Sequence, residues 1–210
     1  MEIAHQVAEK LLFINAVKLS PDKPFTWASG WKSPIYCDNR RILSFPYIRD
    51  YIKSELSNLI DQHFPDAEVI AGVATAGIAH GVLAADLLKL NFVYVRSSQK
   101  NHGLGNQIEG FFHPGQRIVV VEDLISTGGS SMRACEALQA AGGMVKGVAA
   151  VFDYGFERAK KSFQQAGIPV YALSHYEALL EVALEKGMIH QEQLSVLQQW
   201  RQSPDTWGRG

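Results

Sequence analysis

The chain has 210 residues, of which 47% are hydrophobic and 20% charged, a composition typical of a globular protein with one large domain. Its 20 Lys and Arg residues nearly balance 21 Asp and Glu residues, which excludes a global basic field for nucleic acid or an anionic membrane. The two cysteines, Cys37 and Cys135, cannot form a disulfide framework or a four-cysteine zinc site. No signal segment opens the chain, and no run reaches the ~20 apolar residues that span a bilayer. We expect a cytoplasmic protein that binds neither nucleic acid nor membrane.

Hydrophobic spacing predicts helices and short strands in the first 65 residues. Apolar residues recur every three or four positions from Ile3 to Ile14 and predict a helix over residues 2–17. Residues 24–40 are rich in aromatic residues and turn-forming pairs, which predicts a small antiparallel piece. Helical spacing then returns over residues 48–60.

From residue 68 the chain alternates apolar runs with helical segments. Short apolar runs separated by helices are typical of parallel strands buried on both faces. The expected strands are 68–73, 92–95, 117–123, 145–152 and 168–173, and the expected helices between them are 77–90, 130–141 and 157–166. Two helical patterns after residue 174 are expected to cover the sheet or its edge. The pattern predicts an α/β fold with a mainly parallel central sheet flanked by helices, in a single domain over residues 1–210.

The strongest functional signal is RIVVVEDLISTGGSS, residues 117–131. An apolar strand over 118–121 ends in two acids, and a short turn leads to glycines that open a helix. Ligands of open parallel sheets bind beyond the carboxyl ends of strands, and a glycine-rich helix N-terminus offers free N–H groups to an anion. We expect a site for a ligand with hydroxyl groups and a phosphate. Its members are Glu122, Asp123, Leu124, Ile125, Ser126, Thr127, Gly128, Gly129 and Ser130.

Ordinary structural roles compete with this interpretation. Thr127 or Ser130 taken alone is equally well explained as a helix N-cap, but the whole string is not. No lysine follows the glycines, which excludes the phosphate loop of ATPases, and a GxGxxG fingerprint is absent from the segment.

A second segment, residues 94–110, is polar and rich in glycine. It carries Arg96, Lys100 and His102, three side chains suited to closing over a diphosphate and neutralising a leaving group. We expect a mobile loop here, because so polar a stretch cannot bury itself. Composition alone favours a solvated surface loop without a function.

A third segment, residues 25–40, could bind a planar base. Its aromatic residues Phe25, Trp27, Trp31 and Tyr36 could stack on a ring, and Lys32 could meet a carboxylate. Taken alone, the segment is better explained as a small hydrophobic cluster.

Together the strings FT..SG.KSP, R...K.H.G and ED..STGG resemble the orotate phosphoribosyltransferases, of the type I phosphoribosyltransferase family, in order and spacing. The last string resembles the motif that this wider family uses for phosphoribosyl pyrophosphate (PRPP). The resemblance runs from the first helix to about residue 155. It implies a small hood over the base, contributed by about residues 1–40.

The resemblance also implies the activity, which is transfer of the 5-phosphoribosyl group from PRPP to orotate in pyrimidine biosynthesis. Lys100, His102 and Asp123 would be catalytic, and Arg96, Lys100 and His102 would bind the diphosphate. The segment from Glu122 to Ser130 would hold the ribose and 5-phosphate, with Ser126 also near orotate, and Tyr36 and Lys32 would bind the base. Mg²⁺ would be held mainly through PRPP, and a homodimer would share the 96–110 loop between subunits.

Four positions depart from the family pattern. Many members have a lysine at Ala28, Ala76 and Ser97 and an orotate-binding arginine at Tyr154, so the resemblance leaves the exact orotate contacts open. Two other functions stay open. One is a regulatory module that binds PRPP, which would not need the 96–110 loop and would carry a DNA-binding helix. The other is a type I transferase that acts on a purine, against which the FT..SG.KSP string argues.

Overall fold

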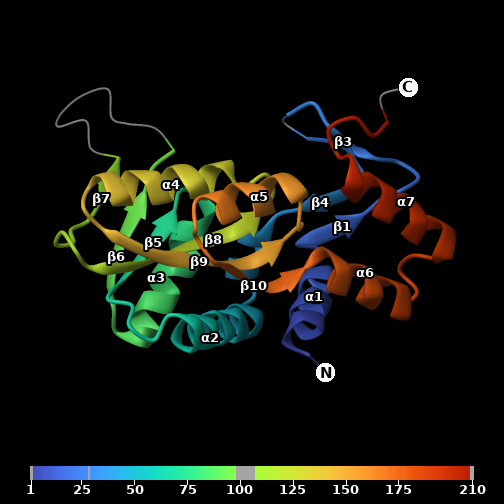
Figure 1. The fold of residues 1–210 in the computed structure, drawn as a ribbon. Helices are drawn as coiled ribbons and strands as arrows, with labels where there is room; N and C mark the ends of the chain where they lie inside the picture. Colours follow the sequence, from blue (N-terminus) through green and yellow to red (C-terminus); the bar gives the residue numbers. More distant parts are fainter. Residues whose placement is uncertain (1, 28, 98–106, 209–210) are drawn as a thin grey trace.

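A six-stranded sheet with helices on both faces forms the centre of the molecule (Figure 1). The computed structural model describes residues 2–27, 29–97 and 107–208. The sheet has the order β10-β9-β8-β5-β6-β7, and all neighbours are parallel except β6 and β7. The strands are β5 (Val69–Val73), β6 (Asn91–Val95), β7 (Ile108–Glu109), β8 (Arg117–Ile125), β9 (Met144–Asp153) and β10 (Val170–His175). The predicted mainly parallel α/β fold is confirmed.

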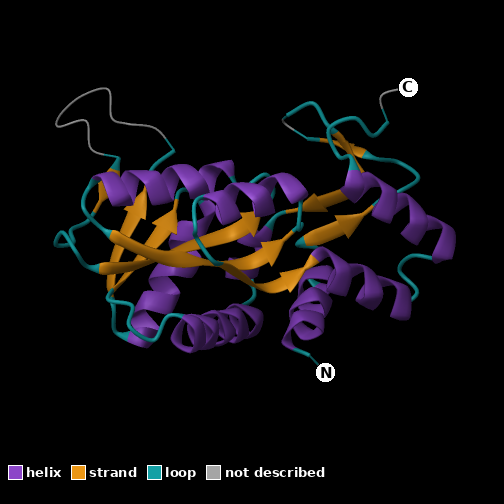
Figure 2. Ribbon diagram, viewed as in Figure 1, coloured by secondary structure: helices purple, strands orange, loops and turns teal. Residues whose placement is uncertain are grey.

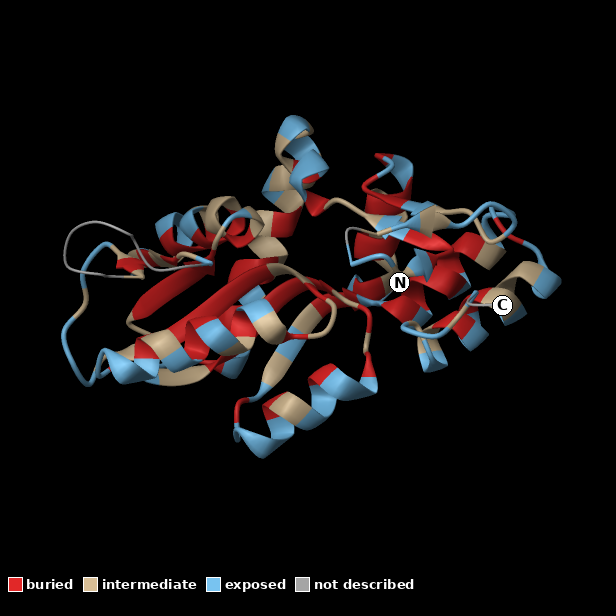
Figure 3. Cartoon of the chain, turned by 90° about the horizontal axis from the view of Figure 1, so that it is seen from above, coloured by how far each residue is buried: buried red, intermediate tan, exposed pale blue. Residues whose placement is uncertain are grey.

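Alternate residues of the central strands enter two separate cores. Along β8, Ile118 and Val120 face one core while Val119 and Val121 face the other, as the two-residue period of a strand requires. One core lies under α4 (Gly129–Ala140) and α5 (Glu157–Gln165). The other lies under α1 (Ile3–Phe13), α2 (Pro46–His63), α3 (Ala76–Leu88) and α6 (Tyr176–Glu185). Figure 3 shows the buried strands between helices whose outer faces are exposed.

Two short antiparallel strand pairs lie beyond the carboxyl ends of β8 and β9 (Figure 2). The strand β1 (Val17–Leu19) pairs with β4 (Ile35–Cys37), and β2 (Phe25–Thr26) pairs with β3 (Lys32–Ser33). The 3-10 helix η1 (Asn39–Ser44) links β4 to α2, and α7 (Gln191–Gln202) follows α6. The predicted antiparallel piece is therefore confirmed as two pairs, one of which uses a strand from outside residues 24–40.

Two element boundaries and the packing of one helix differ from the prediction. The first helix ends at Phe13 instead of residue 17, because Asn15 has a φ of 54° and the chain turns into β1. The strand β8 continues through Glu122 and Asp123 to Ile125, because Leu124 and Ile125 still pair with β9. The last helix packs beside the β2–β3 pair rather than on the sheet edge, through Trp200. Among the described helices, none has the length and apolar character needed to cross a membrane.

Candidate functional site

Glu122 and Asp123 lie side by side in β8, where the sheet ends. Glu122 is 4% exposed, and its Oε2 accepts hydrogen bonds from the hydroxyl groups of Ser130 (3.1 Å) and Ser131 (3.0 Å). Its Oε1 accepts the main-chain N–H of Asp123 at 3.1 Å. These bonds tie the acidic pair to the first turn of α4. Ser131 was not among the predicted residues.

Burial changes the protonation of this pair. Burial and then the neighbouring charge of Asp123 raise the pKa of Glu122 from 4.5 to about 8. Burial likewise raises the pKa of Asp123, while the positive charge of Arg40 opposes that shift. Two carboxylates in one buried site resist ionising together, so a ligand that brings hydroxyl donors or a cation stabilises the ionised pair.

This shift predicts a dependence of stability on pH. Glu122 ionises near pH 4.5 when unfolded but only near pH 8 when folded, so its stabilising contribution is complete below pH 4.5 and is lost as the pH rises toward 8. We expect the unfolding free energy of the wild type, minus that of Glu122→Gln, to fall between pH 5 and 8. Denaturant titrations at several pH values measure this difference.

The matched control is Glu136→Gln, an exposed position on α4 that should give a flat difference. Burial lowers the pKa of His80 to about 4, so His80 makes the unfolding free energy rise with pH, opposite to the effect of Glu122. Because the wild type and both variants contain His80, its contribution cancels in each difference. A flat difference for Glu122→Gln as well would contradict the buried, protonated carboxyl.

The glycine turn, which comprises residues 127–129, leads from the end of β8 into α4. Gly128 has a φ of +78°, and a Cβ there would lie 2.9 Å from Cε2 of Phe163, so only glycine fits. Gly129 begins the helix, whose first N–H groups lack intrahelical partners and point out of its N-terminus. Such an N-terminus favours an anion. The guanidinium of Arg133 lies beside Gly129, a cation that the sequence motif did not single out.

A cavity of about 370 Å³ lies on one side of this turn. Trp27, Tyr36 and Tyr154 give it aromatic walls, and Ser126 contributes a hydroxyl. The full lining is Thr26, Trp27, Tyr36, Cys37, Leu124, Ser126 and Tyr154. We call this space the aromatic cavity. It brings together the short strand pairs and the end of β8, which are far apart in the sequence.

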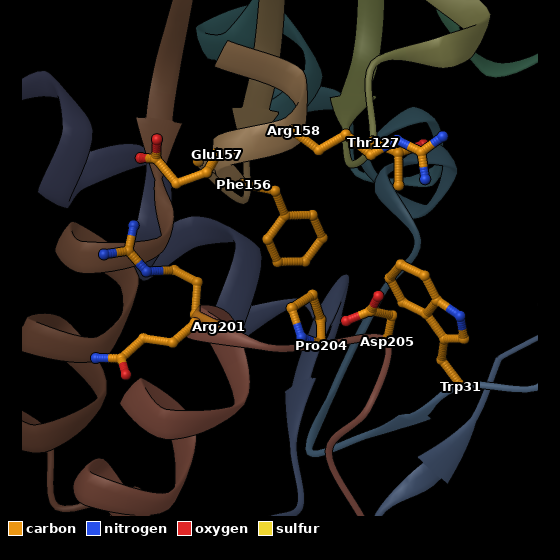
Figure 4. A pocket seen from close by; sticks show the side chains of 10 residues that line it. Trp31, Thr127, Phe156, Glu157, Arg158, Arg201, Pro204 and Asp205 are labelled. Carbon is orange, nitrogen blue, oxygen red and sulfur yellow. The ribbon is translucent and has the colours of Figure 1, made fainter. Parts of the chain in front are cut away.

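The adjacent residue Thr127 lines a different cavity, of about 340 Å³ (Figure 4). Phe156 projects into this space, with Trp31 on one side and Arg201 on the other. The glycine turn therefore separates two cavities, of which only the aromatic cavity adjoins Ser126.

Two polar residues connect the aromatic cavity to its surroundings. The Lys32 ammonium donates a hydrogen bond to the Thr26 hydroxyl at 2.8 Å, so this predicted cation lies beside the cavity wall without lining it. The fully buried Asn39 donates from Nδ2 to the main-chain oxygen of Asp123 at 2.6 Å and accepts from the Cys37 thiol at 3.3 Å. Asn39 thus links the cavity wall to the acidic pair, and no sequence pattern pointed to it.

Arg96 lies near the first turn of α4. It lines a small cavity of about 20 Å³ with Ser130 and Arg133, and its guanidinium Nη1 lies 3.7 Å from a Glu109 carboxylate oxygen. The predicted diphosphate and 5-phosphate residues therefore approach each other at Arg96 and Ser130. Lys100 and His102 lie outside the described residues, and their roles stay predictions.

The departures from the family pattern have distinct structural settings. Tyr154 is 1% exposed and packs against Trp27 and Trp200, with ring centroids 5.5 Å and 5.7 Å away, so an aromatic wall stands where many members have an arginine. Ala76 is the first residue of α3. Ala28 lies outside the described residues.

The acidic pair supplies oxygen donors of the type that Mg²⁺ prefers. Within residues 2–27, 29–97 and 107–208, no three His, Cys, Asp or Glu side chains gather as a metal-binding group. Mg²⁺ commonly takes one or two carboxylates and completes its shell with substrate oxygens and water. Glu122 and Asp123 fit that mode of binding.

Comparison with known proteins identifies the family. A model of the phosphoribosyl transferase domain matches residues 41–171. Orotate phosphoribosyltransferase of Bacillus subtilis is 56% identical over 95% of this chain and 93% of its own length, and that of Porphyromonas gingivalis is 53% identical over 96% of both chains. The crystal structure of the Aeropyrum pernix enzyme of the same name has a TM-score of 0.76 and 27% identity, covering 88% of this chain and 99% of its own. The similarity thus extends well beyond residue 155, and the chain belongs to the orotate phosphoribosyltransferases.

Proposed function

We propose that the chain transfers the 5-phosphoribosyl group of PRPP to orotate, giving orotidine 5′-phosphate and diphosphate in the pathway to UMP. One observation carries the assignment: the acidic pair, the glycine turn and the aromatic cavity meet at consecutive residues, with Asp123 in β8, Ser126 in the cavity and Gly129 at the start of α4. Identity above 50% to proteins that carry this name supports it.

The acidic pair and the turn form the proposed site for PRPP. The carboxylates of Asp123 and Glu122 accept charge-assisted hydrogen bonds from the ribose hydroxyls. The segment from Leu124 to Ser130 surrounds the 5-phosphate, whose charge the α4 N-terminus stabilises. Arg96, Lys100 and His102 bind the diphosphate, with Arg96 close to Ser130.

The aromatic cavity is the proposed orotate site. Tyr36 and Trp27 offer ring faces for a planar base, and the Ser126 hydroxyl offers a hydrogen bond. Lys32 is the cation beside the wall, bound to Thr26, and it attracts the orotate carboxylate. The buried Tyr154 leaves the wall uncharged at a position where many members have arginine.

The chemistry is a displacement at the anomeric carbon. The ring nitrogen of orotate releases its proton to solvent and forms the new bond to this carbon. The bond to the diphosphate oxygen breaks with its electron pair leaving on the diphosphate. Lys100 stabilises this developing negative charge, and His102 donates a hydrogen bond to it. Asp123 holds the ribose in line between the two groups. Mg²⁺ would be held mainly through PRPP, with Glu122 and Asp123 as the protein carboxylates that face it, and would supply neutralisation of the diphosphate charge.

We further propose a homodimer in which the 96–110 loop of one subunit reaches the site of the other, and a cytoplasmic location. The family resemblance supports the shared loop. Cys37 and Cys135 are both free thiols, which fits a reducing compartment.

Phosphorus NMR tests the reaction. PRPP, orotate and Mg²⁺ with the protein should give diphosphate and a phosphate monoester of orotidine in equal amounts, and omitting orotate should leave PRPP intact. Release of diphosphate without the nucleotide would contradict transfer to the base.

A further inference from the structure

The last helix, α7, contacts the base-binding region through one fully buried side chain. Trp200 is 0% exposed, and its indole Nε1–H donates a hydrogen bond to the main-chain oxygen of Lys32, 168 residues earlier, at 3.1 Å. Its ring packs edge-on against Trp27, with centroids 5.5 Å apart and an interplanar angle of 81°. It also contacts Tyr154 at 5.7 Å and an angle of 76°. Trp200 thus touches two walls of the aromatic cavity without lining it.

The β2–β3 pair needs contacts with the rest of the molecule to hold it in place. Each strand has two residues, joined in the register Phe25 with Ser33 and Thr26 with Lys32. It forms a sheet of its own, and an isolated two-stranded hairpin is marginally stable in water. The pair nevertheless carries Thr26, with Trp27 immediately after it, so its position sets the shape of the aromatic cavity.

Two of the described contacts that hold this pair come from the indole N–H groups of Trp27 and Trp200. Trp27 donates from Nε1 to the main-chain oxygen of Ile35 at 3.0 Å, which ties it to β4. Trp200 holds the opposite strand at Lys32, the residue whose ammonium bonds Thr26. On its far side Trp200 packs against Phe156 at 5.5 Å and Tyr176 at 5.7 Å, both anchored in the main core. A continuous aromatic cluster therefore joins the core to the hairpin.

We infer that Trp200 is a positioning residue for orotate: it acts through Trp27 and the Lys32 main chain to hold the aromatic cavity in its binding shape. This inference rests on the proposed orotate site. It assigns to the C-terminal helix a part in base recognition rather than a purely structural role. PRPP binding, which uses β8 and α4, should not depend on it.

The test compares Trp200→Phe with Ser174→Ala. Trp200→Phe keeps an aromatic ring but removes the hydrogen bond to the hairpin, and it should raise KM for orotate about three- to tenfold while KM for PRPP stays unchanged. Ser174→Ala also removes one buried hydrogen bond to a main-chain oxygen, that of Ala4 at 2.8 Å, but this bond joins β10 to α1 and involves neither α7 nor the hairpin. It should lower the melting temperature similarly and leave both KM values unchanged.

Hydrogen exchange gives a readout that does not need turnover. The Trp27 amide donates to the Trp31 oxygen at 2.9 Å within the hairpin, and it should exchange faster in Trp200→Phe than in Ser174→Ala. An unchanged orotate KM in Trp200→Phe, or an equal rise in both variants, would overturn the inference. If the wild type itself does not consume orotate, the proposed function fails, and unchanged exchange at Trp27 would separately remove the positioning role.

Discussion

Asp123→Asn is expected to weaken PRPP binding about 10- to 100-fold, because hydrogen bonds from ribose hydroxyls to a charged acceptor exceed those to a neutral amide. The fold should survive the change. The main-chain N–H and oxygen of Asp123 are held by Glu122 and Asn39, and neither bond uses the side chain that is replaced. Calorimetric titration with PRPP and Mg²⁺ measures the loss of affinity.

Asp153→Asn is the matched control for this variant. Asp153 ends the neighbouring strand β9, is partly buried like Asp123, and accepts the Gly155 N–H at 2.7 Å. It lies in β9, outside the segment from Glu122 to Ser130 that is proposed to hold PRPP. Replacing the Asp153 carboxylate with an amide should leave the PRPP affinity unchanged. Normal affinity in Asp123→Asn, or equal losses in both variants, would remove Asp123 from the ribose site.

Lys100→Ala should lower turnover about 100- to 1,000-fold, the usual cost of removing one preorganised donor from a developing negative charge. The melting temperature should stay that of the wild type, because this residue belongs to a polar, glycine-rich segment. Lys161→Ala, an exposed lysine on α5, is the control and should keep full turnover. Steady-state rates at saturating PRPP and orotate measure the effect, and unchanged turnover would exclude Lys100 from the mechanism.

The same two variants test the shared loop. If each site combines its own Asp123 with the Lys100 of the partner's loop, a dimer of one Lys100→Ala and one Asp123→Asn subunit has both defects in one site. Its other site has neither defect. Random mixing of the subunits should therefore restore about a quarter of the wild-type rate from two weakly active proteins. No gain on mixing would show that each loop serves its own subunit.

The sequence predicted the features of the fold that depend on burial. The strands β5, β8 and β9 are continuous apolar runs because both faces of a parallel sheet are covered, and their alternate residues indeed enter two cores. The end of β8 was placed too early, because two acids usually end a buried strand. Here Leu124 and Ile125 extend the pairing beyond them. The strands β1 and β7 have three and two residues and leave too little pattern to detect.

Site residues were predictable where a local motif carries them. The string from Glu122 to Ser130 is contiguous, so its position at the end of β8 followed from the sequence. Asn39 and Trp200 act through main-chain atoms 84 and 168 residues away, and such contacts leave no local spacing to recognise. The aromatic segment around Trp27 was ambiguous between a hydrophobic cluster and a base site. In the structure Trp27 packs against Trp200, as a hydrophobic cluster requires, and it also lines the cavity that we propose for the base.

Orotate consumption, followed by ultraviolet absorbance with PRPP, Mg²⁺ and purified protein, tests the central claim most directly. Parallel reactions offer hypoxanthine, adenine or uracil in place of orotate. We predict loss of orotate alone, abolished when either PRPP or Mg²⁺ is omitted. Turnover of a purine, or measurable PRPP binding without turnover of any base, would contradict the assignment.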